Sequence, residues 1–370
     1  MDKQTKLTYK QSGVDYGKID PLKVMAQKAA RQTAGNLQAV GFDEIEASRG
    51  ESAYVVDLGA FYLATITECL GTKSLVADQT RAITGQTHYD AIAQDTIAMA
   101  VNDLITVGAR PLTVHAYWAV GGSDWFDDRP RMQDLVTGWR QACDLAGVAW
   151  GGGETPSLAG VVEPGAIDLA ASCSGIIQPK QRLTVGQHLQ PGDAIVLLES
   201  SGIHANGLTL ARKLAQQLAD GYATRIGDGR MYGEALLDPT LIYSPVTEAL
   251  FEAGVAVRYL SNITGHGWRK LMRHPGAFTY RITEAPPVPP VLEFMVEQTN
   301  LDVGEAYGSL NMGAGLAVFV PAGDAAKAVE ISGQLGIKAY HAGTVERGIK
   351  QVIIEPLGVV FEGTSLELRA

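Results

Sequence analysis

Four segments of the sequence combine acidic or hydroxyl side chains with glycines, a composition suited to holding phosphates and metal ions. The first segment covers residues 67–73, where Glu68, Gly71, Thr72 and Lys73 follow a predicted strand. A carboxylate, a flexible backbone, a hydroxyl and a point charge form a sensible set for a metal-bound phosphate. A strand, a turn and a surface lysine explain the same residues without any ligand.

The second segment belongs to a predicted helix over residues 90–108. Asp95, Asn102 and Asp103 are seven and eight positions apart, so they share one face of this helix. Hard oxygen donors on one face suit Mg²⁺, which takes carboxylates together with water and phosphate oxygens. Asp90 can add a further carboxylate, or it can simply be the helix N-cap. Asn102 and Asp103 stand inside an apolar stretch, so they need polar partners in the fold.

The third segment is a cluster of three glycines followed by Glu154. Such a backbone, with Gly153 next to the carboxylate, could contact a ligand closely. A plain tight turn accounts for the cluster equally well.

The fourth segment, residues 200–207, lies between a predicted strand and a predicted helix and contains Ser201, His204 and Asn206. Hydroxyls, amides and a helix N-terminus together suit an anion. His204 is either a general base or only a polar loop residue. Residues 264–267 form a similar glycine-rich turn ahead of a basic stretch, residues 268–274.

Composition narrows the possible partners and reactions. The formal net charge of −10 disfavours nucleic acid or an anionic membrane as a partner. The three cysteines are far apart, no apolar run is long enough to span a membrane, and we expect a cytoplasmic protein. A Gly-x-Ser-x-Gly elbow, a Cys-x-x-Cys pair and a His-Glu-x-x-His helix are all absent from the sequence, which argues against hydrolase, redox and zinc-protease chemistry.

Strands and helices alternate along both halves of the chain, which indicates an α/β or α+β fold. The 370 residues suggest two domains, and the polar stretch at residues 179–193 is the natural boundary. We therefore predict an N-terminal domain over residues 1–183 and a C-terminal α/β domain over residues 184–370.

Seven segments, in their order and spacing, resemble the motifs of the aminoimidazole-ribonucleotide synthetases, also called phosphoribosylformylglycinamidine cyclo-ligases. Residues 95–104 are similar to that family's Asp-x-x-Ala-Met-x-Val-Asn-Asp-Leu, and residues 152–155 match its Gly-Gly-Glu-Thr. The other similar segments are residues 9–15, 67–73, 200–207, 263–267 and 311–315. The start of the chain, Tyr-Lys-x-x-Gly-Val-Asp, favours this family over the related selenophosphate synthetases and thiamine-monophosphate kinases.

The resemblance implies two α/β domains, a homodimer whose core is the N-terminal domain, and the use of ATP and Mg²⁺. The implied reaction is the cyclisation of formylglycinamidine ribonucleotide in purine biosynthesis, through phosphorylation of its amide oxygen. The implied catalytic residues are His204, Glu154 and Asp103. The implied nucleotide-binding residues are Lys73, Thr72, Gly71, Asn102, Gly153, Ser201 and Asn206. The implied metal ligands are Glu68, Asp90, Asp95 and Asp103.

Several motif positions differ from the family pattern. Glu68-Cys69 replaces Asp-Gly, Pro156-Ser157 removes an acidic residue, Gly308 replaces an arginine and His266 replaces a glycine. These differences leave two alternatives open. One is an ATP-dependent enzyme of the same fold with another small amide, amine or phosphate substrate, and the other is a non-catalytic nucleotide-binding paralogue.

Overall fold

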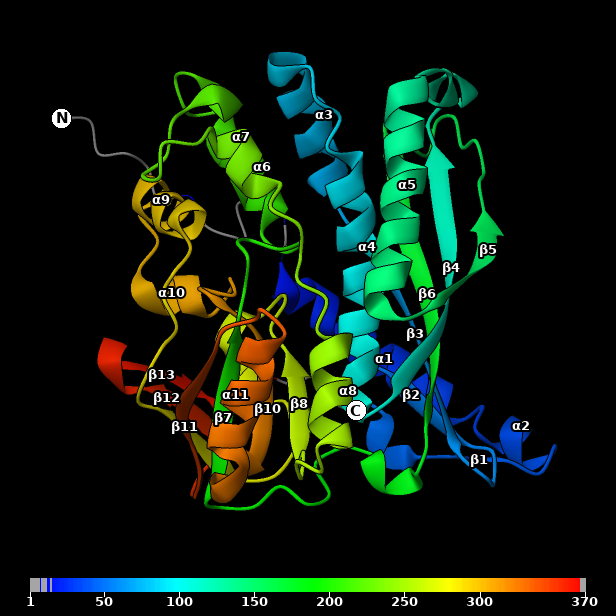
Figure 1. Ribbon diagram of the computed structural model, residues 1–370, viewed down its shortest axis with the longest axis vertical. Helices are drawn as coiled ribbons and strands as arrows, with labels where there is room; N and C mark the ends of the chain where they lie inside the picture. The colour runs from blue at the N-terminus through cyan, green and yellow to red at the C-terminus, as the bar shows by residue number, and fades with distance from the viewer. Residues whose placement is uncertain (1–6, 8–11, 14, 367–370) are drawn as a thin grey trace.

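The computed structural model describes residues 7, 12–13 and 15–366. Most of the N-terminal motif over residues 9–15 lies outside this range. The described residues form two β-sheets with helices packed between and around them (Figure 1). None of the helices in this part of the chain has the length together with the hydropathy that a membrane span requires.

The N-terminal half contains a six-stranded sheet with the order β1-β2-β3-β6-β4-β5. Neighbouring strands are antiparallel except for β4 and β5, which are parallel. The strands are β1 Asp43–Glu44, β2 Tyr54–Asp57, β3 Tyr62–Cys69, β4 Arg110–Val120, β5 Ala149–Glu154 and β6 Ile167–Ile177. The sequence of the glycine cluster is also compatible with a tight turn, but in the structure the cluster belongs to the edge strand β5. Every residue of β5 is exposed.

Helices cover one face of this sheet (Figure 1). They are α3 Lys73–Thr84, α4 Tyr89–Leu104 and α5 Arg129–Ala146. Residues of β6 alternate accordingly: Leu169 and Ala171 are buried, whereas Asp168 and Ser172 on the other face are exposed. The exposed positions of β6 show that these three helices do not cover the outer face of the sheet.

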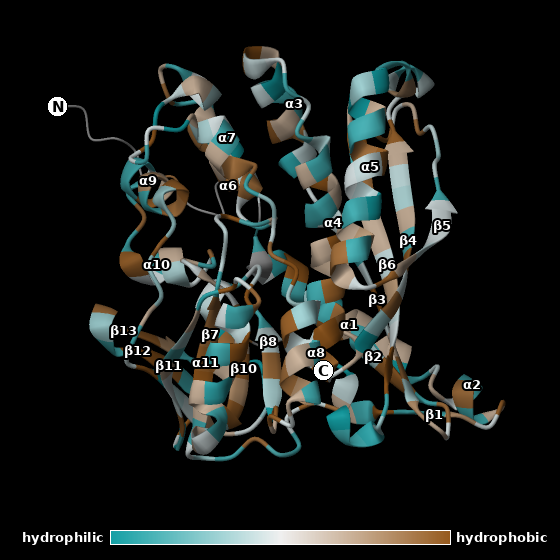
Figure 2. Cartoon of the chain, in the orientation of Figure 1, coloured by the Kyte–Doolittle hydropathy of each residue, from teal (hydrophilic) through white to brown (hydrophobic). Residues whose placement is uncertain are grey.

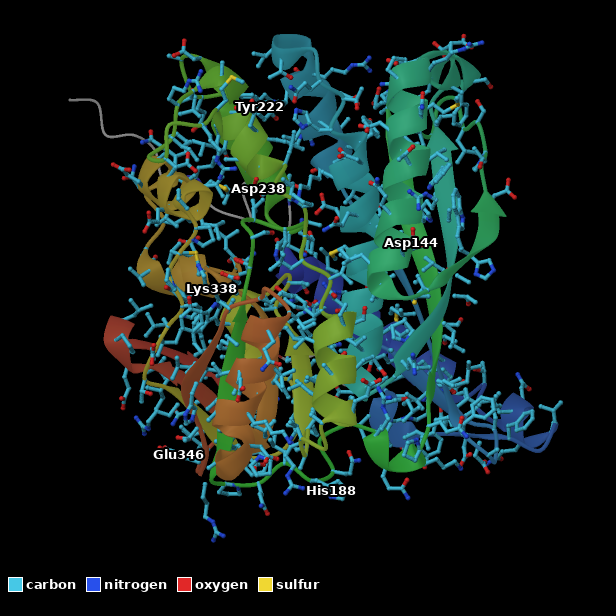
Figure 3. The ribbon with its side chains drawn as sticks, in the orientation of Figure 1. Asp144, His188, Tyr222, Asp238, Lys338 and Glu346 are labelled. Carbon is cyan, nitrogen blue, oxygen red and sulfur yellow. The ribbon has the colours of Figure 1, made fainter. Side chains whose placement is uncertain are left out.

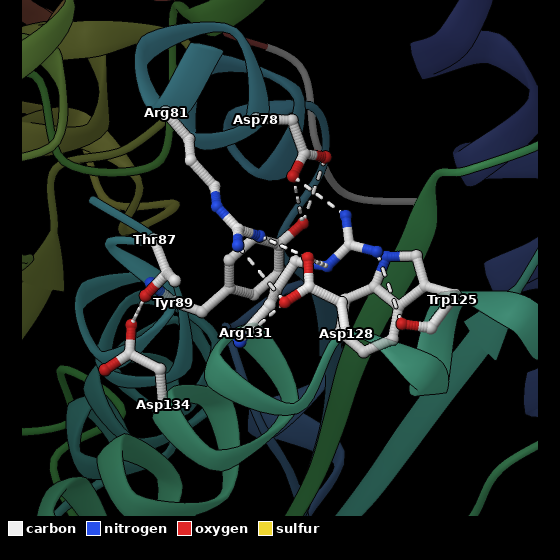
Figure 4. A network of polar contacts seen from close by, with 8 residues as sticks. All are labelled: Asp78, Arg81, Thr87, Tyr89, Trp125, Asp128, Arg131 and Asp134. Atoms are coloured by element: carbon white, nitrogen blue, oxygen red, sulfur yellow. Dashed lines mark hydrogen bonds and ion pairs between the residues drawn. The ribbon is translucent and has the colours of Figure 1, made fainter. Parts of the chain in front are cut away.

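A polar network joins these three helices at the end of α4 that begins with Tyr89 (Figure 4). The Tyr89 hydroxyl donates to the Asp78 carboxylate, and the Arg131 guanidinium pairs with the same carboxylate at 3.2 Å. Arg131 also lies over the Trp125 ring, 4.3 Å from its centroid. Charge pairing and cation–π contact thus fix the helix bundle at this end.

The C-terminal half contains a seven-stranded sheet with the order β13-β12-β9-β11-β7-β10-β8. Its strands are β7 Asp193–Glu199, β8 Tyr259–Asn262, β9 Phe278–Ile282, β10 Ala314–Pro321, β11 Ala339–Arg347, β12 Gln351–Ile354 and β13 Val359–Glu362. Its helices are α6 Leu208–Ala215, α7 Tyr232–Leu236, α8 Ser244–Glu252, α9 Pro290–Thr299, α10 Val303–Tyr307 and α11 Ala325–Gln334. Strands β7 and β10 are buried along nearly their whole length, and Figure 2 shows them as hydrophobic.

The N-terminal segment crosses between the two halves. Helix α1 Tyr16–Arg31 begins after Asp15, whose side chain accepts a hydrogen bond from the Gly17 N–H, and the short α2 Gly35–Gln38 follows. Ahead of α1, the Leu7 N–H donates to the Thr299 carbonyl at the end of α9. The N-terminal segment therefore contains two separate helices.

Candidate active site

A cavity of about 840 Å³ lies where the two halves meet. Its walls come from α1, from β3 and β6, from the last turns of α4, and from the turn that follows β8. This volume is within the range of sites that bind small molecules. Glu68, Asp103 and Asn206 are the residues of the expected site that line it.

Two carboxylates, Glu68 on β3 and Asp103 on α4, face each other in this cavity. Burial and the negative charge of Asp103 raise the pKa of Glu68 to about 7. Asn262 Nδ2 donates to Asp103 Oδ1 at 2.7 Å and so orients that carboxylate from the C-terminal half. Two like charges held together in a partly buried site form a place for a cation.

Lys270 and Arg273, which follow β8, are two of the four lysine and arginine residues that line the cavity, and the others are Lys23 and Arg49. Lys270 is buried, and its Nζ donates to the Thr264 hydroxyl. Burial lowers the pKa of Lys270 to about 8, although the charges of Asp103 and Glu68 act in the opposite direction. Because Lys270 is on the C-terminal half and the two carboxylates are on the N-terminal half, the site needs both halves.

Arg273 joins the same cavity to the loop before β2. Its Nε donates to the Gly50 carbonyl at 3.0 Å, and its Nη1 donates to the Ser52 hydroxyl at 2.8 Å. The residues expected at the site do not include Lys270 or Arg273. The available signal was the basic stretch directly after the glycine-rich turn.

The carboxylate pair fits Mg²⁺ in part. Within residues 7, 12–13 and 15–366, no group of three or more His, Cys, Asp or Glu side chains could hold a metal ion. Magnesium is usually held by one or two carboxylates, with water and substrate phosphate as its remaining ligands. The donor chemistry of Glu68 and Asp103 therefore suits a magnesium ion that arrives with a nucleotide.

The other two expected metal ligands lie elsewhere on α4. Asp90 is exposed in the first turn and lines a second cavity of about 590 Å³ with Arg230. At 1.5 Å per residue, it is about 20 Å along the helix from Asp103, and Asp95 is about 12 Å from Asp103. One ion cannot contact all four carboxylates.

Lys73 and Asp95 form an ion pair with an Nζ–Oδ2 distance of 2.7 Å, and both side chains are fully buried. Asn102 also turns away from the cavity, because its Nδ2 donates to the Leu241 carbonyl at 2.8 Å. Gly71 is exposed with a φ of 76°, and Thr72 precedes the first residue of α3. None of these five residues lines the cavity.

The residues expected around the reacting end of the substrate are dispersed. Gly153 and Glu154 are exposed on the edge strand β5 and do not line the cavity. Ser201 Oγ donates to the Pro239 carbonyl at 2.6 Å. Asn206 does reach the cavity, where its Nδ2 lies 3.8 Å from Met99 Sδ.

His204 is buried in the C-terminal half with a left-handed backbone, at a φ of 59°. Its Nε2 accepts a hydrogen bond from the Ser201 N–H at 3.2 Å. Burial, and to a smaller extent the charge of Lys73, lowers the pKa of His204 to about 3. The imidazole is therefore neutral at physiological pH and already acts as an acceptor inside the protein.

His266, which replaces a glycine of the motif, also has a left-handed backbone, with a φ of 70°. This conformation favours glycine, so a histidine here costs about 1 kcal/mol or more. His266 Nε2 lies 3.1 Å from Asp20 Oδ2 on α1, and His266 itself lines the cavity. The substitution thus ties α1 to the turn on the opposite wall.

Gly308, which replaces an arginine of the motif, lies against Arg269. A Cβ at position 308 would come within 2.7 Å of Arg269 Nη2 and 2.9 Å of the Gly304 carbonyl oxygen. Gly308 does not line the cavity. The guanidinium of Arg269 therefore occupies the space next to residue 308.

Comparison with known families agrees with this architecture. Residues 50–177 match the N-terminal domain of the AIR synthase related proteins, and residues 190–355 match the C-terminal domain of the same family. The chain belongs to the AIR synthase related protein family. The family resemblance and the two-domain α/β fold inferred from the motifs are thereby confirmed.

Curated relatives cover almost the whole chain. A phosphoribosylformylglycinamidine cyclo-ligase of Methanococcus maripaludis is 33% identical over 348 residues, 93% of each chain. A protein of the same name from Pyrococcus furiosus is 34% identical over 362 residues, 96% of this chain and 99% of the relative.

Solved structures share the fold at lower identity. The structure of a HypE–HypF complex aligns with a TM-score of 0.57 and 18% identity, over 89% of this chain and 98% of the other. AaThiL complexed with AMPPCP and TMP aligns with a TM-score of 0.55 and 17% identity, over 83% of this chain and 87% of the other. At these identities the likeness supports the fold alone.

Proposed function

We propose that this protein is an ATP-dependent cyclo-ligase that converts formylglycinamidine ribonucleotide into aminoimidazole ribonucleotide in purine biosynthesis. The observation that carries the proposal is the match to two proteins named phosphoribosylformylglycinamidine cyclo-ligase over at least 93% of this chain. ATP phosphorylates the amide oxygen of the substrate. A substrate nitrogen then attacks the activated carbon, closes the imidazole ring and releases phosphate.

The cavity supports this reaction because such a reaction depends mainly on positioning and on neutralising charge. Lys270 and Arg273 bring cations to one wall, and Asn262 holds Asp103 in place on the other. Glu68 and Asp103 are the residues that would hold Mg²⁺. A bound magnesium ion would neutralise phosphate charge. Helix α1 covers part of the cavity and would restrict the access of water.

The decisive experiment incubates the pure protein with ATP, Mg²⁺ and formylglycinamidine ribonucleotide, and measures ADP and aminoimidazole ribonucleotide. Formation of both products in equal amounts supports the proposal. ATP turnover only with other acceptors would favour a different substrate, and no nucleotide binding would favour a non-catalytic paralogue. The Asp103→Asn variant is the matched negative control, since it removes a cavity charge while conserving shape.

We also propose that the protein is a homodimer, formed through the N-terminal sheet. The outer face of this sheet exposes Asp168 and Ser172, and its edge strand β5 is exposed throughout. Uncovered faces and edges of sheets are common sites of association. Light scattering should give twice the chain mass of 39.3 kDa, and a monomer at micromolar concentration would contradict the proposal.

We place the reaction in the cytoplasm, as expected for an enzyme of purine biosynthesis. The cysteines Cys69, Cys143 and Cys173 are free thiols, which suits a reducing compartment. Fractionation of cells that express a tagged chain tests this location.

A further inference from the structure

The segment that joins α7 to α8, residues 238–243, has no regular secondary structure and lies against α3 and α4. Figure 3 shows Asp238 at the start of this segment, beside α3. Buried backbone groups outside helices and sheets need other hydrogen-bond partners. Here side chains of the N-terminal half supply them.

The first part of the segment is held by the buried ion pair. Lys73 Nζ donates to the Asp238 carbonyl at 2.9 Å while it pairs with Asp95. Asp95 Oδ1 accepts from the Thr240 N–H at 2.8 Å and from the Thr240 hydroxyl. Gln94 Nε2 donates to the Thr240 carbonyl at 2.9 Å.

The second part of the segment is held by Asn102. Its Nδ2 donates to the Leu241 carbonyl at 2.8 Å, and its Oδ1 accepts from the Tyr243 N–H at 3.0 Å. Both ends of the amide are therefore used by backbone groups of the C-terminal half. Asn102 is directly followed by Asp103, which accepts a hydrogen bond from Asn262 of the C-terminal half.

These side chains are closed to ligands. Lys73 and Asp95 have no exposed area, and Asn102 is 2% exposed. A phosphate could reach Lys73 only by breaking its pair with Asp95, and that would leave a charge buried without a partner. The geometry suits a structural link between the halves better than contact with a nucleotide.

We propose that Lys73, Asp95 and Asn102 are positioning residues. They hold residues 238–243, and through that segment they fix the C-terminal half against α4, so that Asn262 and Lys270 meet Asp103 and Glu68 across the cavity. They touch neither nucleotide nor metal. The activity readouts below rest on the proposed function, whereas the exchange readout does not.

The experiment compares Lys73→Met with the double variant Lys73→Met/Asp95→Asn. In Lys73→Met, the Asp95 carboxylate loses its partner, and we expect amide hydrogen exchange at Thr240 and Tyr243 to accelerate at least tenfold. In the double variant, no buried charge is unpaired, and the new amide still accepts from Thr240. We expect exchange and kcat to return to within tenfold of the natural protein, with KM for ATP changed less than threefold.

A milder variant and a matched control keep the test interpretable. Gln94→Met removes only the bond to the Thr240 carbonyl and should accelerate exchange there by a smaller factor, even if Lys73→Met does not fold. Arg131→Met/Asp78→Asn removes another ion pair of the same helix bundle that does not touch residues 238–243. It should leave exchange at Thr240 and Tyr243, and KM for ATP, unchanged.

The proposal is overturned if the folded double variant keeps natural exchange at Thr240 and Tyr243 but its KM for ATP rises tenfold or more. That result would make Lys73 a nucleotide contact. It is also overturned if Lys73→Met folds and leaves exchange at both amides unchanged. If the natural protein has no cyclo-ligase activity, the proposed function fails, while the exchange measurements still decide the present proposal.

Discussion

Helix α4 carries two carboxylates eight residues apart, Asp95 and Asp103, in very different surroundings. Asp95 is fully buried, and its charge is balanced by Lys73. Asp103 faces an open cavity, and Glu68 opposite it is a second acid, whose pKa is raised to about 7. Residue type and helix face are the same in both cases. The two carboxylates differ in the partner that the fold gives them. Asp95 meets a lysine and forms a structural link, whereas Asp103 meets a second acid and belongs to the candidate site.

The largest expected effect comes from removing the buried carboxylate of Asp95. Asp95→Leu leaves the Lys73 ammonium buried without a counter-charge, which should lower the free energy of unfolding by about 3–5 kcal/mol. Urea denaturation measures the loss. Asp103→Asn is the matched control and should change the unfolding free energy far less. A loss below about 1 kcal/mol in Asp95→Leu would mean that burial does not distinguish the two carboxylates.

The second prediction concerns pH and reports on the burial of His204 next to this ion pair. The pKa of His204 is about 3 in the folded protein and about 6.5 in the unfolded chain, so the unfolded chain binds more protons between these values. This contribution to stability is complete above pH 6.5 and is lost as the pH falls toward 3, at about 1.4 kcal/mol per pH unit.

Denaturation curves between pH 7 and pH 4 should show this decline for the natural protein. His204→Asn keeps a residue that tolerates a left-handed backbone and should flatten the decline. An equally steep decline in the variant would assign the pH dependence to other groups.

The third prediction concerns Asp103, the carboxylate that faces the cavity. Asp103→Asn should lower turnover at least tenfold, equivalent to about 1.4 kcal/mol of activation free energy, with unfolding little changed. Glu68→Gln is the companion variant, because it removes the opposing carboxylate. Steady-state ADP release measures both. An unchanged rate in Asp103→Asn would remove this residue from the proposed metal site.

The smallest expected effect concerns the contact between His266 and α1, which forms one wall of the cavity. His266→Gly removes an unfavourable backbone conformation, worth about 1 kcal/mol, but also removes the contact to Asp20. Global stability should therefore change little. Trypsin should cut α1 at Lys23 and Lys28 several-fold faster, while Asp20→Asn, which conserves the shape of the side chain, should have a weaker effect. Equal cleavage rates in all three proteins would contradict a role of His266 in holding α1.

Much of the fold followed from the sequence, because local patterns encode single elements. The helix predicted over residues 90–108 corresponds to α4 and the short 3-10 turn after it. Helix α3 was missed, since Lys73 was read together with the strand and turn before it. The boundary at residues 183 and 184 stays a prediction.

The site was harder to predict because it depends on contacts between distant parts of the chain. A shared helix face places Asp95 and Asp103 in line but still separates them by about 12 Å along the axis. The partner of Asp95 besides Lys73 is Thr240, 145 residues further along the chain. Lys270 and Asn262 likewise reach the carboxylates from the C-terminal half, and the basic stretch after the glycine-rich turn does not show which side chains they meet.

The contacts to residues 238–243 also bear on how the chain folds during synthesis. While only the N-terminal half has left the ribosome, Asp95 and Asn102 lack the backbone groups that they bind in the finished protein. Helix α4 packs on β3, β6 and α5 of the same half, but these polar side chains then lack their partners. The hydrogen bonds of Asp95 and Asn102 can therefore be completed only after Tyr243 has emerged, which links the folding of the two halves.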